Sequence, residues 1–311
     1  MTVSPPVEPL QIRGLVKSYG TVQAVRGIDL SVRAGEVFGF VGPNGAGKST
    51  TIRCILDLLR PTAGQIRVFG GDPRVDGPRI RERVAYVPGE LRLPERLTGR
   101  QFLRSIGRLR ARFETGRIDE LAERFTLDLD RPIRQLSSGN RRKVSVLGAF
   151  LSDADLLILD EPTGGLDPLM QHEFLQLVRE RRAAGATVFL SSHILSEVQS
   201  IADRMAVLRA GSIVAAGTVN EVRGLARQRV EVWFDTAAPA GLAGLPGLGQ
   251  IVIDGRRFTA VLTGSARPLI DALAGQPISS IQIQEPDLEE AFLRLYTENP
   301  AAAAATGEDS R

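Results

Sequence analysis

The sequence predicts an α/β domain with a helical segment inserted in it, followed by a small α+β appendage. Short apolar runs alternate with helical patterns from Leu10 to about Gly217, as in α/β domains. The runs Val37–Val41 and Leu156–Leu159 are continuously apolar, which is typical of strands buried on both faces of a parallel sheet. After Gly217 the apolar runs become short and Gly-rich turns separate them, which indicates a second, smaller domain.

The first domain is predicted over residues 10–220, with the helical segment at about 90–150. Between Thr98 and Phe150 the strand signal vanishes, and arginine-rich helical patterns replace it at Arg100–Arg112 and Ile118–Phe125. The strands expected in this domain are Leu10–Tyr19, Val22–Val32, Glu36–Val41, Gly64–Val68, Arg83–Val87, Leu156–Leu159, Thr187–Ser191 and Arg204–Arg209.

The appendage is predicted over residues 221–298. Residues 1–9, rich in proline, are expected to be a flexible leader, and residues 299–311, alanine-rich and then polar, a disordered tail. The elements expected in the appendage are strands at Arg229–Phe234, Gln250–Ile253, Phe258–Leu262 and Ser279–Gln284, and helices at Pro268–Leu273 and Asp287–Tyr296.

The composition narrows the class of protein. The 311 residues are 43% hydrophobic and 24% charged, which is ordinary for a globular chain. No run approaches the roughly 18 apolar residues that cross a bilayer, so the chain is not expected to span a membrane. The net charge of +3 is modest and no basic stripe alternates with aromatic residues, so no nucleic-acid partner is expected. The single cysteine, Cys54, lies in an apolar helical stretch and is expected to be a buried structural thiol.

The strongest functional signal is the segment Gly42-Pro-Asn-Gly-Ala-Gly-Lys-Ser49, between an apolar strand and a helical pattern. This is a phosphate loop in its strand–loop–helix context. Its glycines let backbone N–H groups turn toward phosphates, and the following helix adds its positive end. Lys48 is predicted to act in catalysis at the phosphate oxygens, and the Ser49 hydroxyl to ligate Mg²⁺. The predicted ATP-binding residues of this segment are Gly42, Pro43, Asn44, Gly45, Ala46, Gly47, Lys48, Ser49 and Thr50.

A second signal is the apolar strand that ends in Asp160-Glu161. The carboxyl end of such a strand lies beside the phosphate loop, so Asp160 is predicted to hold Mg²⁺ through water. Glu161 is predicted to polarise the attacking water as a general base.

Leu136-Ser-Ser-Gly-Asn140 precedes the Asp160-Glu161 strand at the spacing of the signature of ABC-type ATPases. The chain resembles that family from about Leu10 to Gly217. The resemblance implies a P-loop NTPase core with an inserted helical subdomain and a composite active site that closes between two subunits. It implies that Ser137, Ser138, Gly139 and Asn140 contact the ATP held by a partner subunit.

Further positions match the family in order. Tyr19 matches the aromatic residue that stacks on adenine, and Gly165-Leu-Asp167-Pro168 matches the loop that communicates across the dimer through Asp167. His193, after the expected strand Thr187–Ser191, matches the switch histidine that contacts the γ-phosphate. His172 matches nothing and is expected at the surface.

The sequence departs from the family pattern in two places. Gly89-Glu90 follows Tyr86-Val-Pro88, where the family has a glutamine that links the metal and the attacking water to the membrane partner. We hypothesise that the Glu90 carboxylate offers an oxygen to Mg²⁺ in its place. The signature has Ser138 and Asn140 where the family has Gly and Gln. These departures, together with the ending Gln284–Tyr296, resemble the branch of bacterial exporter ATPases that includes drug and antibiotic self-resistance pumps.

The resemblance implies an ATP-hydrolysing subunit at the cytoplasmic face of the membrane that works with a separate transmembrane permease, as a homodimer or with a close paralogue. The transported substrate would be a drug, an antibiotic or another hydrophobic small molecule. One alternative is a soluble ATPase of the same family that acts on ribosomes or nucleic acid. Such proteins carry two domains in one chain or long coiled-coil insertions, and neither feature occurs here. The other alternative is a regulator that binds nucleotide without turnover.

Overall fold

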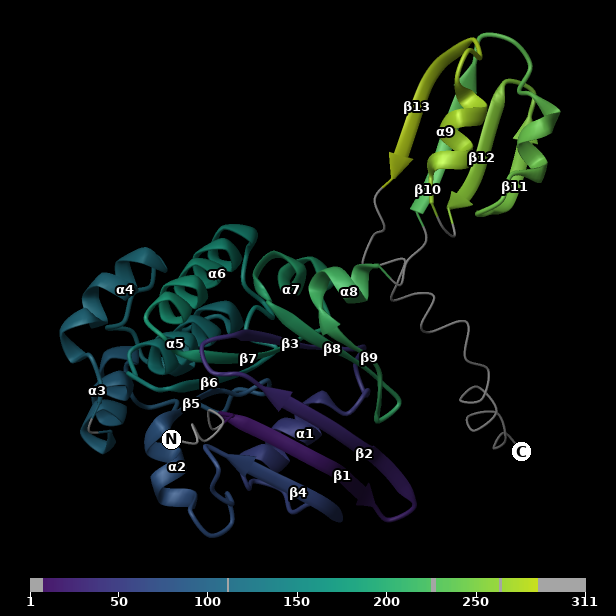
Figure 1. Ribbon diagram of the computed structural model, residues 1–311. Helices are drawn as coiled ribbons and strands as arrows, with labels where there is room; N and C mark the ends of the chain where they lie inside the picture. Colours follow the sequence, from purple (N-terminus) through teal and green to yellow (C-terminus); the bar gives the residue numbers. More distant parts are fainter. Residues whose placement is uncertain (1–7, 111, 225–227, 263–264, 285–311) are drawn as a thin grey trace, which may run out of the picture. The chain divides into compact units, whose positions relative to one another are not determined.

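A six-stranded, mostly parallel sheet forms the centre of the larger of two units in the computed structural model (Figure 1). The structure describes residues 8–110, 112–224, 228–262 and 265–284. The chain divides into the units Met1–Val219 and Asn220–Arg311. Among the residues that the structure describes, no helix is both long enough and apolar enough to cross a bilayer.

The central sheet brings the ends of three buried strands to one edge. Its strand order is β5-β6-β7-β3-β8-β9, and only β9 runs antiparallel to its neighbour. Every residue of β3, β6 and β7 is buried, as the apolar runs of β3 and β6 predict. Because neighbouring parallel strands end at the same edge, the segments after β3, β6 and β7 lie side by side. The strands are β3 (Val37–Val41), β5 (Val84–Val87), β6 (Leu156–Asp160), β7 (Thr187–Ser192), β8 (Arg204–Arg209) and β9 (Ser212–Thr218).

A second, antiparallel sheet of order β2-β1-β4 packs over helix α1. One apolar cluster joins Leu10 and Leu15 of this sheet to Ile52 of α1 and to Phe38 and Phe189 of the central sheet. The rings of Phe38 and Phe189 stack with centroids 5.9 Å apart. This core fixes α1, and hence the loop before it, against both sheets. The elements are β1 (Leu10–Tyr19), β2 (Val22–Val32), β4 (Ala63–Val68) and α1 (Lys48–Ile55).

The described residues between β5 and β6 form helices joined by loops, and none of those residues lies in a strand longer than an isolated bridge. The predicted change from strands to helices is therefore confirmed. The Thr98 hydroxyl caps α3 by accepting a hydrogen bond from the Gln101 N–H, and the Gln101 side chain accepts one from the Thr98 N–H. This pair of bonds is a capping box. Figure 1 shows α3 and α4 at the opposite end of the unit from β1 and β2. Besides α1, the unit contains α2 (Gly77–Arg83), α3 (Gly99–Leu109), α4 (Ile118–Arg124), α5 (Ser138–Phe150), α6 (Pro168–Ala183) and α7 (Leu195–Ile201).

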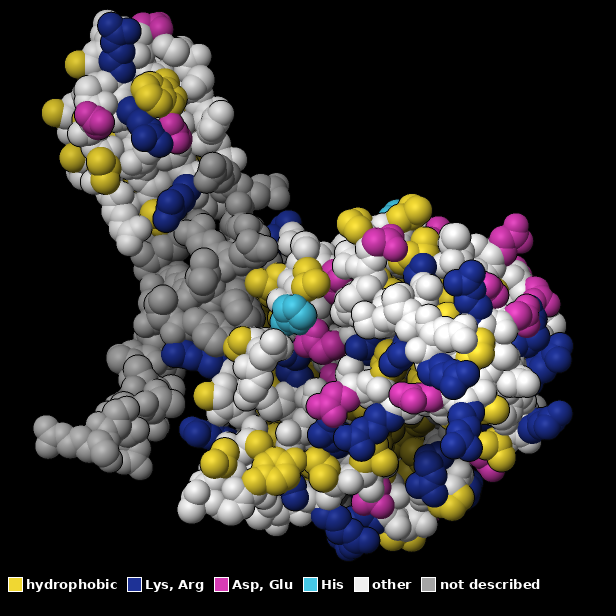
Figure 2. All heavy atoms as spheres, turned by 180° about the vertical axis from the view of Figure 1, so that it is seen from behind, with side chains coloured by type: hydrophobic (Ala, Val, Ile, Leu, Met, Phe, Trp, Pro, Cys, Tyr) yellow, Lys and Arg dark blue, Asp and Glu magenta, His cyan; other side chains and the backbone are white. Residues whose placement is uncertain are grey.

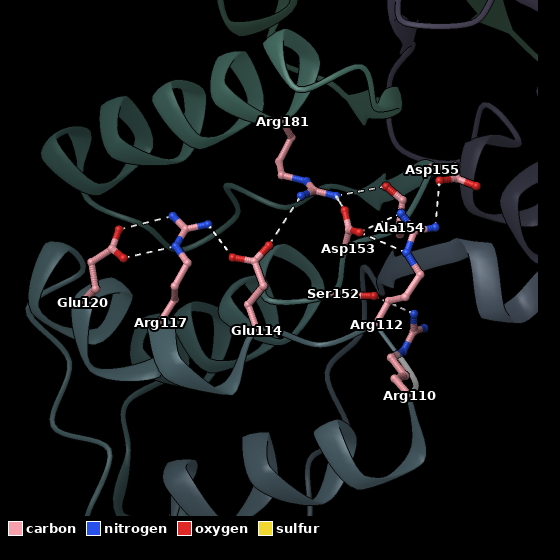
Figure 3. Close-up of polar contacts among 10 residues, drawn as sticks. All are labelled: Arg110, Arg112, Glu114, Arg117, Glu120, Ser152, Asp153, Ala154, Asp155 and Arg181. Atoms are coloured by element: carbon pink, nitrogen blue, oxygen red, sulfur yellow. Dashed lines mark hydrogen bonds and ion pairs between the residues drawn. The ribbon is translucent and has the colours of Figure 1, made fainter.

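A chain of arginine–carboxylate contacts connects the helical segment to the central sheet (Figure 3). Arg181 of α6 is 10% exposed and contacts Asp153 at 3.3 Å, Glu114 at 3.8 Å and the Ala154 carbonyl at 3.0 Å. Arg112 pairs with Asp153 at 2.6 Å from the solvent side. Figure 2 shows the same mixture more widely: on the face in view, Lys and Arg side chains of this unit lie among Asp and Glu side chains.

The second unit contains a four-stranded antiparallel sheet of order β11-β12-β10-β13 with α9 packed on one face. Alternate residues of β10, Val230, Val232 and Phe234, are buried against Leu269 and Leu273 of α9. This alternation is the pattern of a sheet with one covered face. The elements are β10 (Gln228–Phe234), β11 (Leu248–Asp254), β12 (Arg257–Leu262), β13 (Ile278–Gln284) and α9 (Arg267–Leu273); a short helix α8 (Val219–Arg223) crosses the boundary between the units.

All twelve expected strands are present, with ends that differ from the prediction by at most two residues. The sequence analysis missed β9, whose residues are mostly half-buried and lack a clear alternation of apolar and polar side chains. The expected helix Arg100–Arg112 ends earlier, at Leu109. The expected helix Asp287–Tyr296, the tail 299–311 and residues 1–7 of the leader lie outside the described residues.

Candidate functional site

The phosphate loop lies between β3 and α1, and glycine is required at its closest approaches. A Cβ on Gly42 would lie 2.4 Å from the Leu208 carbonyl oxygen, and one on Gly47 would lie 2.5 Å from the Ala24 carbonyl oxygen. Gly47 also has φ 108°, and Gly45 has φ 79°, a region that side chains disfavour. Gly47 caps α1 without a side-chain hydrogen bond, so the first N–H groups of the helix stay available to an anion.

Lys48 is folded back over this loop. Its side chain is 5% exposed, and Nζ donates to the Gly42 carbonyl at 2.6 Å and to the Pro43 carbonyl at 3.1 Å. Nζ also lies 3.0 Å from Oε1 of Glu161. Charged phosphate oxygens are stronger acceptors for an ammonium group than carbonyl oxygens are. When a phosphate is bound in the loop, the Lys48 ammonium can therefore exchange its carbonyl partners for a phosphate oxygen. Ser49 and Thr50 follow, half-buried in the first turn of α1.

Asp160 is the last residue of β6 and is 1% exposed. Its Oδ1 accepts a hydrogen bond from the Ser191 hydroxyl at 2.7 Å. A Cβ on Gly89 would lie 3.0 Å from Asp160 Oδ2, so the space beside that oxygen tolerates only a small neighbour. This buried carboxylate and the Ser49 hydroxyl fit Mg²⁺, a cation that takes few protein ligands and keeps waters and substrate phosphates. Among the described residues, no three His, Cys, Asp or Glu side chains gather into a self-sufficient metal site.

Glu161 lies between the side chains of Lys48 and His193. Its Oε1 faces Lys48, and its Oε2 lies 2.5 Å from Nδ1 of His193, which follows β7. The backbone N–H of Glu161 is held by the carbonyl and hydroxyl oxygens of Ser191 at 3.2 and 3.1 Å. The structure thus brings Lys48, Asp160, Glu161 and His193, predicted from three motifs that are distant in the sequence, to one edge of the sheet.

Other predicted residues lie apart from this centre. Ser137 caps α5 and accepts from the Asn140 N–H at 3.2 Å, and Asp167 caps α6 and accepts from the Met170 N–H at 3.0 Å. A Cβ on Gly139 would lie 2.7 Å from the Gly165 carbonyl oxygen, so the signature and the Asp167 loop touch within the chain. No hydrogen bond or ion pair described for this chain joins the signature residues, Ser138 included, to the phosphate loop. Tyr19, at the end of β1, is 47% exposed.

Glu90 pairs with Arg53 of α1. Its side chain is 77% exposed and Oε2 lies 3.7 Å from the Arg53 guanidinium. Its neighbour Gly89 lies against the Asp160 carboxylate. The role of Glu90 in holding Mg²⁺ therefore stays a hypothesis, and it would require this side chain to turn.

Two residues of the site were not predicted from the sequence. Arg142 of α5, 9% exposed, donates to the carbonyls of Pro88 and Gly89 at 2.6 Å each. Glu197 of α7, 7% exposed, accepts from the Thr163 hydroxyl at 2.9 Å and the Ser192 hydroxyl at 3.0 Å. Glu197 could have been predicted as a site residue from its acidic side chain four residues after His193. Arg142 could not, because nothing in the sequence distinguishes it from the many other arginines.

Burial shifts the pKa values of two groups beside this centre. It raises the pKa of Glu197, which the two hydroxyl donors lower in part. Burial, and next the negative charge of Asp160, raise the pKa of Tyr86 to about 12. Both shifts follow from the cost of removing a charged form from water. Tyr86 therefore stays a neutral hydroxyl near the Asp160 carboxylate.

Comparisons with known proteins identify the family of this chain. Residues 25–164 match the family model described as ABC transporter. The chain is 37% identical to the daunorubicin resistance ATP-binding protein DrrA3 of Streptomyces coeruleorubidus, across 97% of both chains. It is 33% identical to a Nod factor export ATP-binding protein I of Cupriavidus metallidurans, covering 92% of this chain and 96% of the relative. A solved structure of an ABC transporter ATP-binding subunit matches with a TM-score of 0.65 at 33% identity, covering 69% of this chain and 92% of that one.

Proposed function

The chain belongs to the ABC transporter family as an ATP-binding subunit and is an ATPase of that family, and from this premise we propose that it powers an exporter whose membrane-spanning permease is a separate chain. The observation that carries the hydrolytic role is the Glu161 carboxylate, held between Lys48 and His193 beside the phosphate loop. Two relatives that match over nearly the whole chain are named for drug resistance and for Nod factor export. Their names support a role in export rather than an ATPase that acts on ribosomes or nucleic acid.

In the proposed reaction, the loop N–H groups and Lys48 bind the phosphates of ATP. Ser49 and Asp160 hold Mg²⁺, which neutralises phosphate charge when bound. Lys48 moves to the phosphate, which frees Glu161 to accept a proton from the attacking water. His193 keeps the Glu161 side chain oriented and would contact the γ-phosphate.

We propose that two subunits complete each site. The signature residues, from Ser137 to Asn140, lie apart from the phosphate loop within one chain, so an anion site at the start of α5 is free for a second chain. A pair of chains related by a twofold axis would form two equal sites. The partner is either a second copy or a close paralogue, with Asp167 at the contact between them.

Glu161→Gln tests hydrolysis directly. The amide keeps the size of the side chain and loses its basicity, so turnover should fall by roughly 100-fold or more while ATP binding persists. ATP binding is measured by equilibrium titration with a fluorescent ATP analogue, and turnover by phosphate release. A variant with wild-type turnover would exclude Glu161 as the base.

The export role calls for a separate experiment. We expect the chain to co-purify with a membrane permease at the cytoplasmic face of the membrane, and its phosphate release to rise when the transported compound is added. Daunorubicin and other hydrophobic antibiotics are the first compounds to screen, because the relatives with full-length matches include a daunorubicin resistance protein. Sedimentation with ribosomes and no association with membranes would favour the soluble alternative.

A further inference from the structure

The Arg142 side chain spans from α5 to the loop that follows β5. Its two terminal nitrogens donate to consecutive backbone carbonyls, Pro88 and Gly89, at 2.6 Å each. A planar guanidinium matches such a pair of acceptors, whereas a lysine ammonium offers one compact donor. Both contacts are to backbone, so they fix the path of the loop rather than one side chain.

The held loop borders the proposed Mg²⁺ ligand. Gly89 is the residue whose Cβ would lie 3.0 Å from Asp160 Oδ2. Burial lowers the pKa of Arg142, and the nearby charges of Asp160 and Glu161 oppose that shift, which places the guanidinium within electrostatic reach of both carboxylates. A displacement of the loop would therefore change the space and the charge beside Asp160.

The same helix begins at the signature. Ser137 caps α5, and Arg142 lies about one turn further along a helix of 13 residues. A helix this short moves as a rigid element, so a shift of its first turn carries the guanidinium with it. We propose that Arg142 is a positioning residue that couples the signature end of α5 to residues 88–89, so that engagement of the signature by the partner's nucleotide sets the position of the loop beside Asp160 in the chain's own site. This inference rests on the composite site proposed above.

The neighbouring residue supplies a matched control. Arg141 also donates to backbone carbonyls, those of Ile133, Leu136 and Arg134, at 3.1 to 3.2 Å. Two of these acceptors lie in η2 (Ile133–Gln135) and the third, Leu136, directly follows it, so these bonds tie the start of α5 to the segment immediately before it. Arg141→Gln and Arg142→Gln both remove an arginine from α5. Of the two, Arg142→Gln removes the hydrogen bonds to the carbonyls of residues 88 and 89.

The experiment compares wild type, Arg142→Gln, Arg142→Lys, Arg141→Gln and Arg141→Lys as full chains, measuring phosphate release against ATP and against Mg²⁺. Arg142→Gln should lower kcat by roughly tenfold or more, as small misplacements in active sites do, and raise the Mg²⁺ concentration that gives half the maximal rate. KM for ATP should change by less than about twofold, since Arg142 lies outside the phosphate loop. Arg142→Lys should recover part of kcat, and both Arg141 variants should resemble wild type.

The outcomes separate the two proposals. Unchanged kcat and Mg²⁺ dependence in Arg142→Gln overturn the coupling, and so does an equal loss in Arg141→Gln. Should Arg142→Gln fail to fold, judged by its thermal melt, Arg142→Lys decides: a wild-type Mg²⁺ dependence there overturns the proposal, and a raised requirement supports it. A wild-type chain that hydrolyses no ATP, alone or with its permease, overturns the proposed function and this inference with it.

Discussion

Glu161 is held in an uncommon backbone conformation, with φ 48°. A residue with a Cβ in this region costs about 1 kcal/mol or more, and such residues cluster at functional sites. The two bonds from its N–H to Ser191 maintain the conformation. Because glutamine has the same backbone preferences here, Glu161→Gln changes the chemistry of the side chain while leaving this strain as it is.

Glu197 connects two functional segments through one carboxylate oxygen. Thr163 lies in the loop that leads to Asp167, and Ser192 directly precedes His193. The other oxygen, Oε1, is buried without a hydrogen-bond partner in the structure. An ionised group in this setting destabilises the folded state, which is why burial raises its pKa.

The pH dependence of stability follows from that shift. The folded-state pKa of Glu197 is raised above the ordinary 4.5, so the folded protein binds its proton more tightly than the unfolded chain. This contribution to stability is present below the unfolded pKa and is lost as the pH rises through the folded pKa. Glu197→Gln should therefore gain stability relative to wild type as the pH rises from 4 to 8, measured by urea unfolding.

Glu120 provides a control of opposite sign. Hydrogen bonds from Arg117 lower its pKa, so its contribution is present above the unfolded pKa and lost as the pH falls. Relative to wild type, Glu120→Gln should be least stable near neutral pH and should approach wild type in acid. If the two variants followed the same trend with pH, the assignment of the Glu197 shift would be wrong.

At the scale of elements, Arg181 joins α6 to the turn before β6 and to Glu114 (Figure 3). Its side chain is nearly buried, and its Nε has no hydrogen-bond partner in the structure. Replacing it with methionine keeps the packing volume but leaves the Ala154 carbonyl without this donor. We expect Arg181→Met to lower the free energy of unfolding by about 1–2 kcal/mol, measured by denaturant titration.

Arg112 also pairs with Asp153, but its side chain is exposed to solvent, unlike that of Arg181. Exposed ion pairs contribute little because water and salt screen them, so Arg112→Met should leave the unfolding midpoint close to that of wild type. An equal loss in both variants would show that the network acts as one unit rather than through its buried member.

Much of the first unit could be predicted because its signals are local. The runs of β3 and β6 are apolar throughout and every residue is buried. The phosphate loop, Asp160-Glu161 and the signature are contiguous motifs, and the carboxyl ends of parallel strands bring the first two together. A local pattern in the sequence is therefore enough to predict a functional residue that lies at the end of an apolar strand.

The contacts between distant segments could not be read in the same way. Arg142 and Pro88 are 54 residues apart, and nothing in the sequence around either one indicates the other. Glu90 follows Gly89 in the chain, yet Gly89 lies beside Asp160 while the Glu90 carboxylate pairs with Arg53. The conformation of the loop decides whether Gly89 or Glu90 lies beside Asp160. Arg142 of α5 holds that loop through the carbonyls of residues 88 and 89.

At the scale of the whole molecule, the proposed reaction requires two chains to share each nucleotide. The most direct test is the mass of Glu161→Gln, measured by light scattering, at saturating ATP and Mg²⁺. The variant should be a dimer with ATP and a monomer without it, and the further substitution Ser137→Arg should return it to a monomer by blocking the signature. A Glu161→Gln chain that stays monomeric at saturating ATP, beside a monomeric wild type with full turnover, would contradict the composite site.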